Sequence, residues 1–106
     1  MLFRHSPPTA IILGEARLFA AAQQHLARRG IHAPADVSLI CDDTVPAFAW
    51  CEPAVAHLRW DSRPVVKRVI QWAKNIAAGK EDKRQVLIDG VFEEGGTIGP
   101  VPVRAN

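Results

Sequence analysis

Two adjacent carboxylates, Asp42 and Asp43, follow directly after an apolar run at residues 37–41. A pair of acids can hold a metal ion, act as acid and base, or accept hydrogen bonds from a ligand. Aspartate also bonds its own backbone in turns. The residue types alone leave turn, ligand-binding and catalytic roles open for this pair.

Histidine and cysteine add little to a catalytic interpretation. The histidines fall at positions 5, 25, 32 and 57 and show no HxxxH spacing, and the two cysteines, Cys41 and Cys51, form no CxxC motif. We therefore expect no metal site, no cofactor and no catalytic thiol. His57 could hydrogen-bond a ligand or lie at a surface or hinge. A hydrolase built on Asp42, Asp43 and His57 is the least favoured hypothesis.

A cluster of apolar side chains follows the acids, where an exposed loop would be polar. It consists of Val45, Phe48, Trp50 and Cys51. The cluster is either a surface for a partner protein or part of the core beneath the second strand. We predict a partner surface, because aromatic side chains are enriched in interfaces.

Composition limits the class of protein. The chain has 106 residues and 48% hydrophobic residues, which suits one small domain or part of a larger one and excludes a disordered tail. Its 13 basic and 11 acidic residues form no basic run, so these residues give no nucleic-acid footprint. Two cysteines are too few for a disulfide scaffold and indicate buried free thiols. The apolar run near the N-terminus is too short for a signal peptide, so we expect a cytoplasmic chain.

The first half of the chain has the pattern strand, helix, strand. Residues 9–13 are a short apolar run between prolines and Gly14, which predicts a strand buried on both faces. Residues 15–29 change to a helical period that ends at Gly30. Residues 37–41 form the second strand. Such a βαβ unit predicts a parallel sheet.

The second half repeats this alternation less clearly. Residues 43–53 predict a loop with one helical turn at 47–50, and residues 54–60 predict a third strand. A second helix over 62–78 is expected, capped by Asp61 or Ser62. A strand interrupted at Asp89-Gly90 and a loose tail complete the chain. The order β-α-β-β-α-β places it in the α/β class. The second helix carries a stripe of seven aliphatic residues, listed here: Val65, Val66, Val69, Ile70, Ala73, Ile76 and Ala77.

The sequence resembles the end of the effector-binding domain of LacI-type bacterial transcription regulators. The matching blocks are Pro8-Thr9-Ala10, Arg28-Arg29-Gly30-Ile31, and Ala33-Pro34-Ala35-Asp36-Val37-Ser38-Leu39-Ile40 with Asp43. The resemblance implies a periplasmic-binding-protein-like sensor fold. It also implies that Asp43, Trp60, Glu15 and His57 contact an effector. Glu15-Ala16 replaces the usual Asn-Asp pair and Trp60 replaces a position that is often polar, which implies an altered ligand.

The resemblance further implies that residues 1–106 are a single partial domain. Residues 8–57 and 90–103 would belong to the C-terminal lobe, and residues 58–89 would be a crossover and a helix that packs on the N-terminal lobe. The loop after the two aspartates would lie on a homodimer face. The chain would then be a ligand-sensing and dimerisation fragment that does no chemistry, with DNA bound only by a domain outside it. A fragment of a transport-type sugar-binding protein is the alternative.

Overall fold

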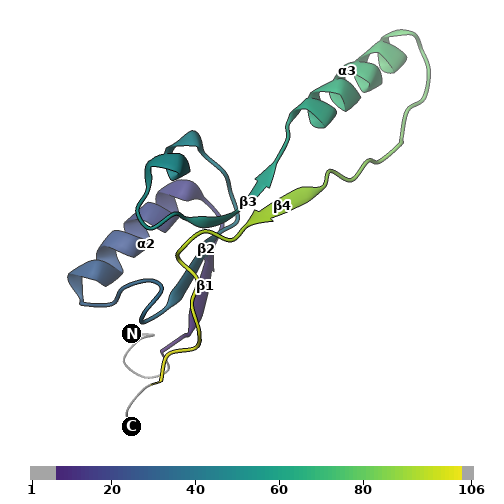
Figure 1. Ribbon diagram of the computed structural model, residues 1–106. Coiled ribbons are helices and arrows are strands. Elements are labelled where there is room, and N and C mark those ends of the chain that lie inside the picture. Colours follow the sequence, from purple (N-terminus) through teal and green to yellow (C-terminus); the bar gives the residue numbers. More distant parts are fainter. Residues whose placement is uncertain (1–6, 104–106) are drawn as a thin grey trace. The chain divides into compact units, whose positions relative to one another are not determined.

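The computed structural model describes residues 7–103 and divides the chain into two compact units. One unit contains the residues up to Arg59 together with those from Phe92 onward, and the other is Trp60–Val91. In chain order the elements are β1 (Ala10–Leu13), α2 (Ala16–Arg28), β2 (Ser38–Cys41), the 3-10 helix η1 (Pro46–Trp50), β3 (Ala56–Trp60), α3 (Arg63–Ala77) and β4 (Gly90–Glu93) (Figure 1). The fold is α/β, as the alternation of periods predicts.

The first unit is built on parallel strands. The strand order is β1-β2-β3-β4, and both described pairings, β1 with β2 and β2 with β3, are parallel. Leu13 lies opposite Cys41, which in turn lies opposite His57. The carboxyl ends of β1 and β2 therefore meet at one edge of the sheet, where Glu15 and the two aspartates follow.

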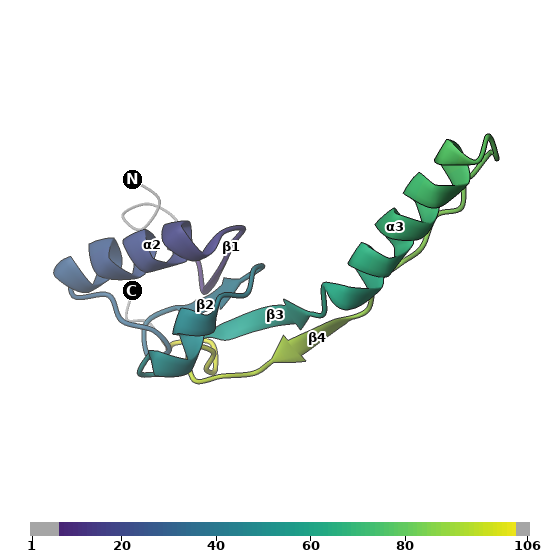
Figure 2. The same cartoon turned by 90° about the horizontal axis from the view of Figure 1, so that it is seen from above.

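Helix α2 covers one face of β1 and β2 (Figures 1 and 2). Phe19 and Leu26, two turns apart on the helix, are buried against Val37 and Leu39 of the second-strand region. The helix ends at Arg28, and Gly30 follows with φ of 77°. This left-handed conformation is the one that glycine adopts at low cost after a helix. The apolar stripe of α2 thus supplies two of the seven buried residues of the core cluster in the described chain.

The first strand differs from its expected environment. Residues 10–13 alternate between exposed and half-buried, and Ile12 is 69% exposed. Because β1 is the terminal strand in the order and α2 covers a single face, its other face has no covering element within the described chain. The prediction of a strand buried on both faces is wrong for this structure.

The glycine-rich segment after β4 is ordered and not the loose tail that its composition predicts. Thr97 is fully buried between β2 and β3. Its hydroxyl donates to the carbonyl of Leu39 at 2.6 Å and accepts the N–H of Ala56 at 3.0 Å. Its own carbonyl accepts the N–H of Leu39 at 2.9 Å. The segment therefore joins β2 to β3 ahead of the point where those strands pair directly.

A single glycine lets this segment approach β3. Gly95 has φ of 60°, and a Cβ added to it would lie 2.7 Å from the backbone of Ala54, Val55 and Ala56. The N–H of Gly96 donates to the Ala54 carbonyl. Any side chain at Gly95 would push the strand and the segment apart.

The second unit consists of α3 and the segment that follows it. Its best-buried ion pair joins Arg68 to Asp82 at 2.5 Å, with the two side chains 14% and 8% exposed. Asn75 also donates to Asp82, and Arg68 donates to the Arg84 carbonyl. None of the described residues of α3 is classed as buried. Polar contacts therefore hold the returning segment on the helix.

The aliphatic stripe of α3 is largely uncovered in the described chain. Val66, Val69, Ile70 and Ile76 are between 47% and 56% exposed. The last strand was predicted over residues 86–92. The observed strand, β4, is shorter and lies further along the chain, at Gly90–Glu93. Ser62 makes no side-chain cap, and the side chain of Asp61 accepts the N–H of Arg63 instead.

Candidate binding site and partner surface

Asp43 lies at the carboxyl edge of the sheet and ties two elements together. Its carboxylate accepts the N–H of Ala16, the first residue of α2, at 3.2 Å and the N–H of Thr44 at 2.8 Å. Glu15, at the N-cap position, makes no side-chain cap of its own. Asp43 thus caps α2 from a neighbouring loop. A carboxylate has about four acceptor positions, so two remain for other donors.

Asp42 and Glu15 flank this capping contact. The backbone N–H of Asp42 donates to the Leu13 carbonyl, while its side chain is exposed. Glu15 is paired with Arg17 at 3.0 Å on the surface. Glu15 directly precedes the residue that Asp43 caps, and the Asp42 N–H extends the pairing of β1 with β2 by one residue. The turn role of the Asp42 side chain stays a prediction.

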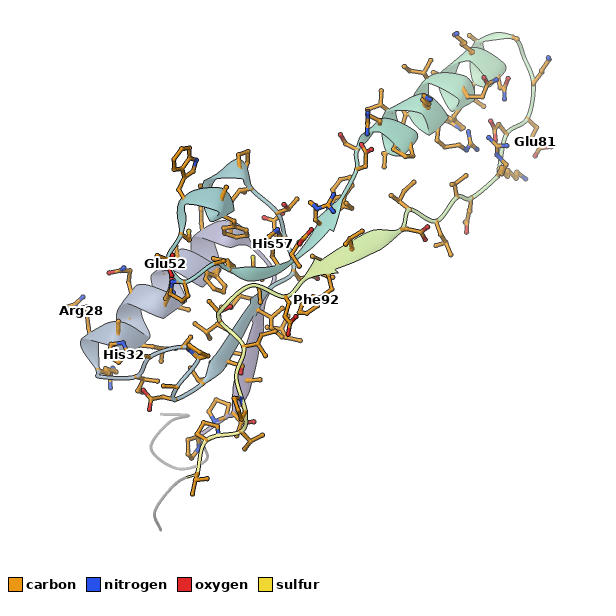
Figure 3. The ribbon with its side chains drawn as sticks, viewed as in Figure 1. Arg28, His32, Glu52, His57, Glu81 and Phe92 are labelled. Atoms are coloured by element: carbon orange, nitrogen blue, oxygen red, sulfur yellow. The ribbon has the colours of Figure 1, made fainter. Side chains whose placement is uncertain are left out.

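His57 is fixed by two contacts. Its Nδ1 lies 2.8 Å from the Val55 carbonyl, and its ring centroid is 5.0 Å from that of Phe48. Figure 3 labels it on β3. Since one ring nitrogen is engaged by the backbone, the other is available to a ligand. Trp60 ends β3, is 48% exposed and is counted in the second unit.

The predicted partner surface separates into an inner and an outer part. Phe48 is 8% exposed and packs 6.0 Å from Phe19, and Val45 packs against the same core. The alternative of intramolecular packing therefore holds for Phe48. Trp50 is 90% exposed, and Cys51 is also exposed. The low cysteine count predicted buried free thiols, and for Cys51 this prediction is wrong.

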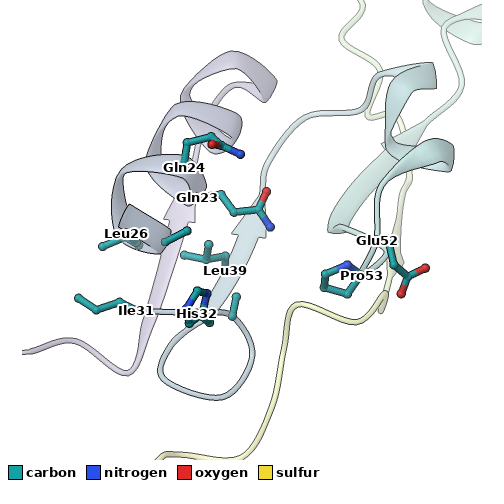
Figure 4. A pocket seen from close by; sticks show the side chains of 10 residues that line it. Gln23, Gln24, Leu26, Ile31, His32, Leu39, Glu52 and Pro53 are labelled. Atoms are coloured by element: carbon teal, nitrogen blue, oxygen red, sulfur yellow. The ribbon is translucent and has the colours of Figure 1, made fainter. Parts of the chain in front are cut away.

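A cavity of about 280 Å³ lies at the amino-terminal edge of β2 and β3, away from Asp43 (Figure 4). The end of α2, the turn at residues 31–33 and the Glu52-Pro53 turn form its walls. Its lining residues are Gln23, Gln24, Leu26, Ala27, Ile31, His32, Ala33, Leu39, Glu52 and Pro53. Sequence patterns gave no sign of this cavity, because its walls come from three separate segments.

The buried Cys41 thiol, which directly precedes the two aspartates, is not suited to catalysis. Burial raises the pKa of the Cys41 thiol above its usual value, and the nearby carboxylate charges of Asp43 and Asp42 add to this effect. A thiol with a raised pKa is a poor nucleophile. Across residues 7–103, no group of three or more His, Cys, Asp or Glu side chains could hold a metal ion.

Comparisons with known proteins place the chain in a family. A family model described as the periplasmic binding protein-like domain matches residues 2–97. The chain therefore belongs to the periplasmic binding protein-like domain family. No curated protein matches the sequence.

Several solved structures that share this fold are bacterial transcription regulators. A LacI-family regulator from Bifidobacterium animalis aligns with a TM-score of 0.82 and 18% identity over 94% of this chain. A sugar-binding LacI-family regulator from Escherichia coli, complexed with phosphate, aligns with a TM-score of 0.76 and 18% identity over 93%. The regulator CcpA of Lactococcus lactis aligns with a TM-score of 0.77 and 10% identity over 92%.

The resemblance predicted from the sequence is thus confirmed for the family and the fold. The chain covers 36% of the Escherichia coli structure, 37% of the Bifidobacterium structure and 36% of the Lactococcus structure, so it spans little more than a third of their length. Within the part of the chain that the structure describes, no helix is long and apolar enough to cross a membrane.

Proposed function

We propose that this chain is a ligand-sensing and dimerisation part of a LacI-type transcription regulator. It binds a small effector, a sugar or related metabolite, and performs no chemistry. The observation that carries the proposal is the placement of Asp43 and Glu15 at the carboxyl edge of parallel strands, within a fold shared with LacI-family regulators. Ligands of open α/β sheets bind at that edge.

Asp43 is the central residue of the proposed effector site. Its backbone contacts fix the carboxylate in place, and its two remaining acceptor positions suit the hydroxyl groups of a sugar. His57 and Glu15 add polar groups, and the indole of Trp60 offers a face for stacking on a ring. Polar acceptors and aromatic faces are the kinds of group that commonly bind a sugar or a purine.

In the whole protein, residues 8–57 and 90–103 belong to the C-terminal lobe of the sensor. Residues 58–89 form the crossover and the helix that packs on the N-terminal lobe, which covers the aliphatic stripe of α3. Effector binding closes the lobes and shifts the geometry of a DNA-binding domain outside this chain. The protein acts in the cytoplasm, as a homodimer whose face includes Trp50 and Cys51.

The effector site is tested by thermal shift on the full-length protein, with a panel of sugars and purines as probes. We expect a ligand-induced rise in Tm in the wild type that is lost in Asp43→Ala and Trp60→Ala. Asp42→Ala is the matched control, since this neighbouring acid is exposed and its side chain makes no hydrogen bond to the described residues of α2. A ligand shift in Asp43→Ala as large as in the wild type would overturn the proposed site.

A further inference from the structure

The cavity at the end of α2 brings together polar side chains that have no partner of their own. It is lined by Gln23 and Gln24 on the α2 side, by His32 after the helix, and by Glu52 on the other side (Figure 4). Within residues 7–103, none of these four side chains makes a hydrogen bond or an ion pair. We propose that this cavity binds a small organic cation, an ammonium group carried on a short aliphatic body. It is a second site, at the other edge of the sheet from the proposed effector site.

The apolar part of the cavity is fixed by the core of the first unit. Leu39 is 1% exposed and Leu26 is 6% exposed, and both belong to the buried core cluster. Ile31 and Pro53 add apolar surface to the same cavity. Aliphatic carbons of a ligand would gain free energy by covering these groups. The volume, about 280 Å³, lies just below the range of about 300–1,000 Å³ that is usual for small-molecule pockets, so the ligand has to be small.

The charge of the lining selects a cation. Glu52 supplies a carboxylate, and none of the described lining residues is a lysine or an arginine. Arg28 is exposed at the end of α2 and does not line the cavity (Figure 3). An anionic ligand would therefore meet a like charge with no cation of the lining to offset it, whereas an ammonium group would be attracted.

The hydrogen-bonding groups of the lining favour the same ligand. The amides of Gln23 and Gln24 each offer an acceptor oxygen, the neutral ring of His32 offers an acceptor nitrogen, and the carboxylate of Glu52 only accepts. An ammonium group has three N–H donors and no acceptor. Three of these four side chains are thus enough to satisfy it. A neutral alcohol has a single O–H donor and gains less from the same set.

The probe in the experiment is n-butylammonium, compared with n-butanol and butyrate, which are similar in size and differ in charge. The side-chain amide signals of Gln23 and Gln24 are followed by NMR at pH 8. The protein is the 106-residue chain carrying Val69→Lys and Ile76→Glu, to limit association through α3. We expect butylammonium to shift both signals to saturation, butanol to bind at least about fivefold more weakly, and butyrate not to bind.

Variants separate the charge of the cavity from its shape. Glu52→Gln keeps the shape and should weaken butylammonium about fivefold while leaving butanol binding unchanged. The matched control is Glu81→Gln, the same change at an exposed acid that does not line this cavity. Ala27→Phe fills the cavity and should abolish binding, whereas Ala21→Phe, at an exposed position of the same helix outside the lining, should not. Circular dichroism confirms that each variant is folded.

Two results would overturn the cation site. The first is equal affinity for butylammonium and butanol, or equal affinity of the wild-type cavity and Glu52→Gln for butylammonium. The second is a shift of the Gln23 and Gln24 signals that follows dilution of the protein and not the probe, because a second copy of the chain would then fill the cavity. The effector site is judged separately, by the thermal-shift assay of Asp43→Ala.

Discussion

Asp43 has a structural role at the position proposed for effector binding. It caps α2 from outside the helix, because the residue at the N-cap position, Glu15, makes no cap and pairs with Arg17 instead. An external cap couples the helix N-terminus to the loop that follows β2. A ligand that binds Asp43 would therefore also act on the start of α2.

Thr97 is the residue whose role was hardest to foresee. A threonine in a glycine-rich segment gives no sequence signal of burial, yet its hydroxyl serves both Leu39 and Ala56. Thr97→Val keeps the shape but leaves that buried carbonyl and that N–H without this partner. We expect a loss of about 2 kcal/mol in the free energy of unfolding, measured by urea denaturation.

Thr97→Ser is the control for this effect. Serine keeps the hydroxyl and removes one methyl group, so its cost should be about 1 kcal/mol and smaller than that of valine. Equal stability of the valine variant and the wild type would show that the two hydrogen bonds do not hold β2 and β3 together.

At the scale of elements, hydrophobic periodicity predicted both helices and the first three strands to within a few residues. It worked because α2 and β2 bury their apolar residues against each other, in Phe19, Leu26 and Leu39. It failed for the burial of β1 and for the bounds of β4. Periodicity shows which residues are apolar enough to be buried. Whether Ile12 is buried depends instead on whether another element covers its face of β1.

The candidate site was predictable only in part. The position of Asp43 followed from the strand before it, since acids after a parallel strand gather at one edge of the sheet. Its capping contact with Ala16 did not, because it joins residues 27 apart in the sequence. The cavity beside Pro53 and the inward position of Phe48 likewise depend on contacts between distant segments.

Asp82 gives the second unit a defined response to acid. Hydrogen bonds from Arg68 and then Asn75 lower the pKa of the Asp82 carboxyl from 3.8 to about 2. A pKa that is lower in the folded state stabilises that state above the unfolded pKa, and the stabilisation is lost as pH falls through the folded value. The contact between α3 and residues 82–84 should therefore persist at pH 5 and weaken between about pH 4 and 2.

The test compares the wild type with Asp82→Asn. The carboxyl carbon shift of Asp82, followed by NMR, should titrate near pH 2. The stability advantage of the wild type over Asp82→Asn should be full at neutral pH, fall from about pH 4 and vanish only below about pH 2. Titration of Asp82 at the ordinary aspartate value of about 4 would contradict the structure.

At the scale of the whole molecule, the chain contains an uncovered aliphatic surface. Val66, Val69, Ile70 and Ile76 lie on one side of α3 and remain about half exposed. A contiguous apolar surface of this kind drives association or aggregation. The chain studied alone should therefore self-associate in a manner that depends on concentration.

Replacing two of these residues tests that expectation. Val69→Lys with Ile76→Glu should raise the soluble fraction and lower the mean mass in light scattering, while Lys67→Glu with Lys74→Glu, two exposed positions of α3 outside the aliphatic stripe, should not. The helix should be retained, because lysine and glutamate are strong helix formers. Unchanged mass would show that the aliphatic surface of α3 is not what drives association.

The contact that Thr97 makes with β2 and β3 also affects how the protein folds during synthesis. The hydrogen-bond partner of Leu39 and Ala56 is Thr97, which lies 58 and 41 residues further along the chain. On the ribosome, β1, α2 and β2 emerge first, but the contact between β2 and β3 stays incomplete until residue 97 has left the exit tunnel. Contacts of such long sequence separation slow folding. A stop codon before position 97 would thus release a product that can form α2 but lacks the hydrogen bonds that join β2 to β3 through Thr97.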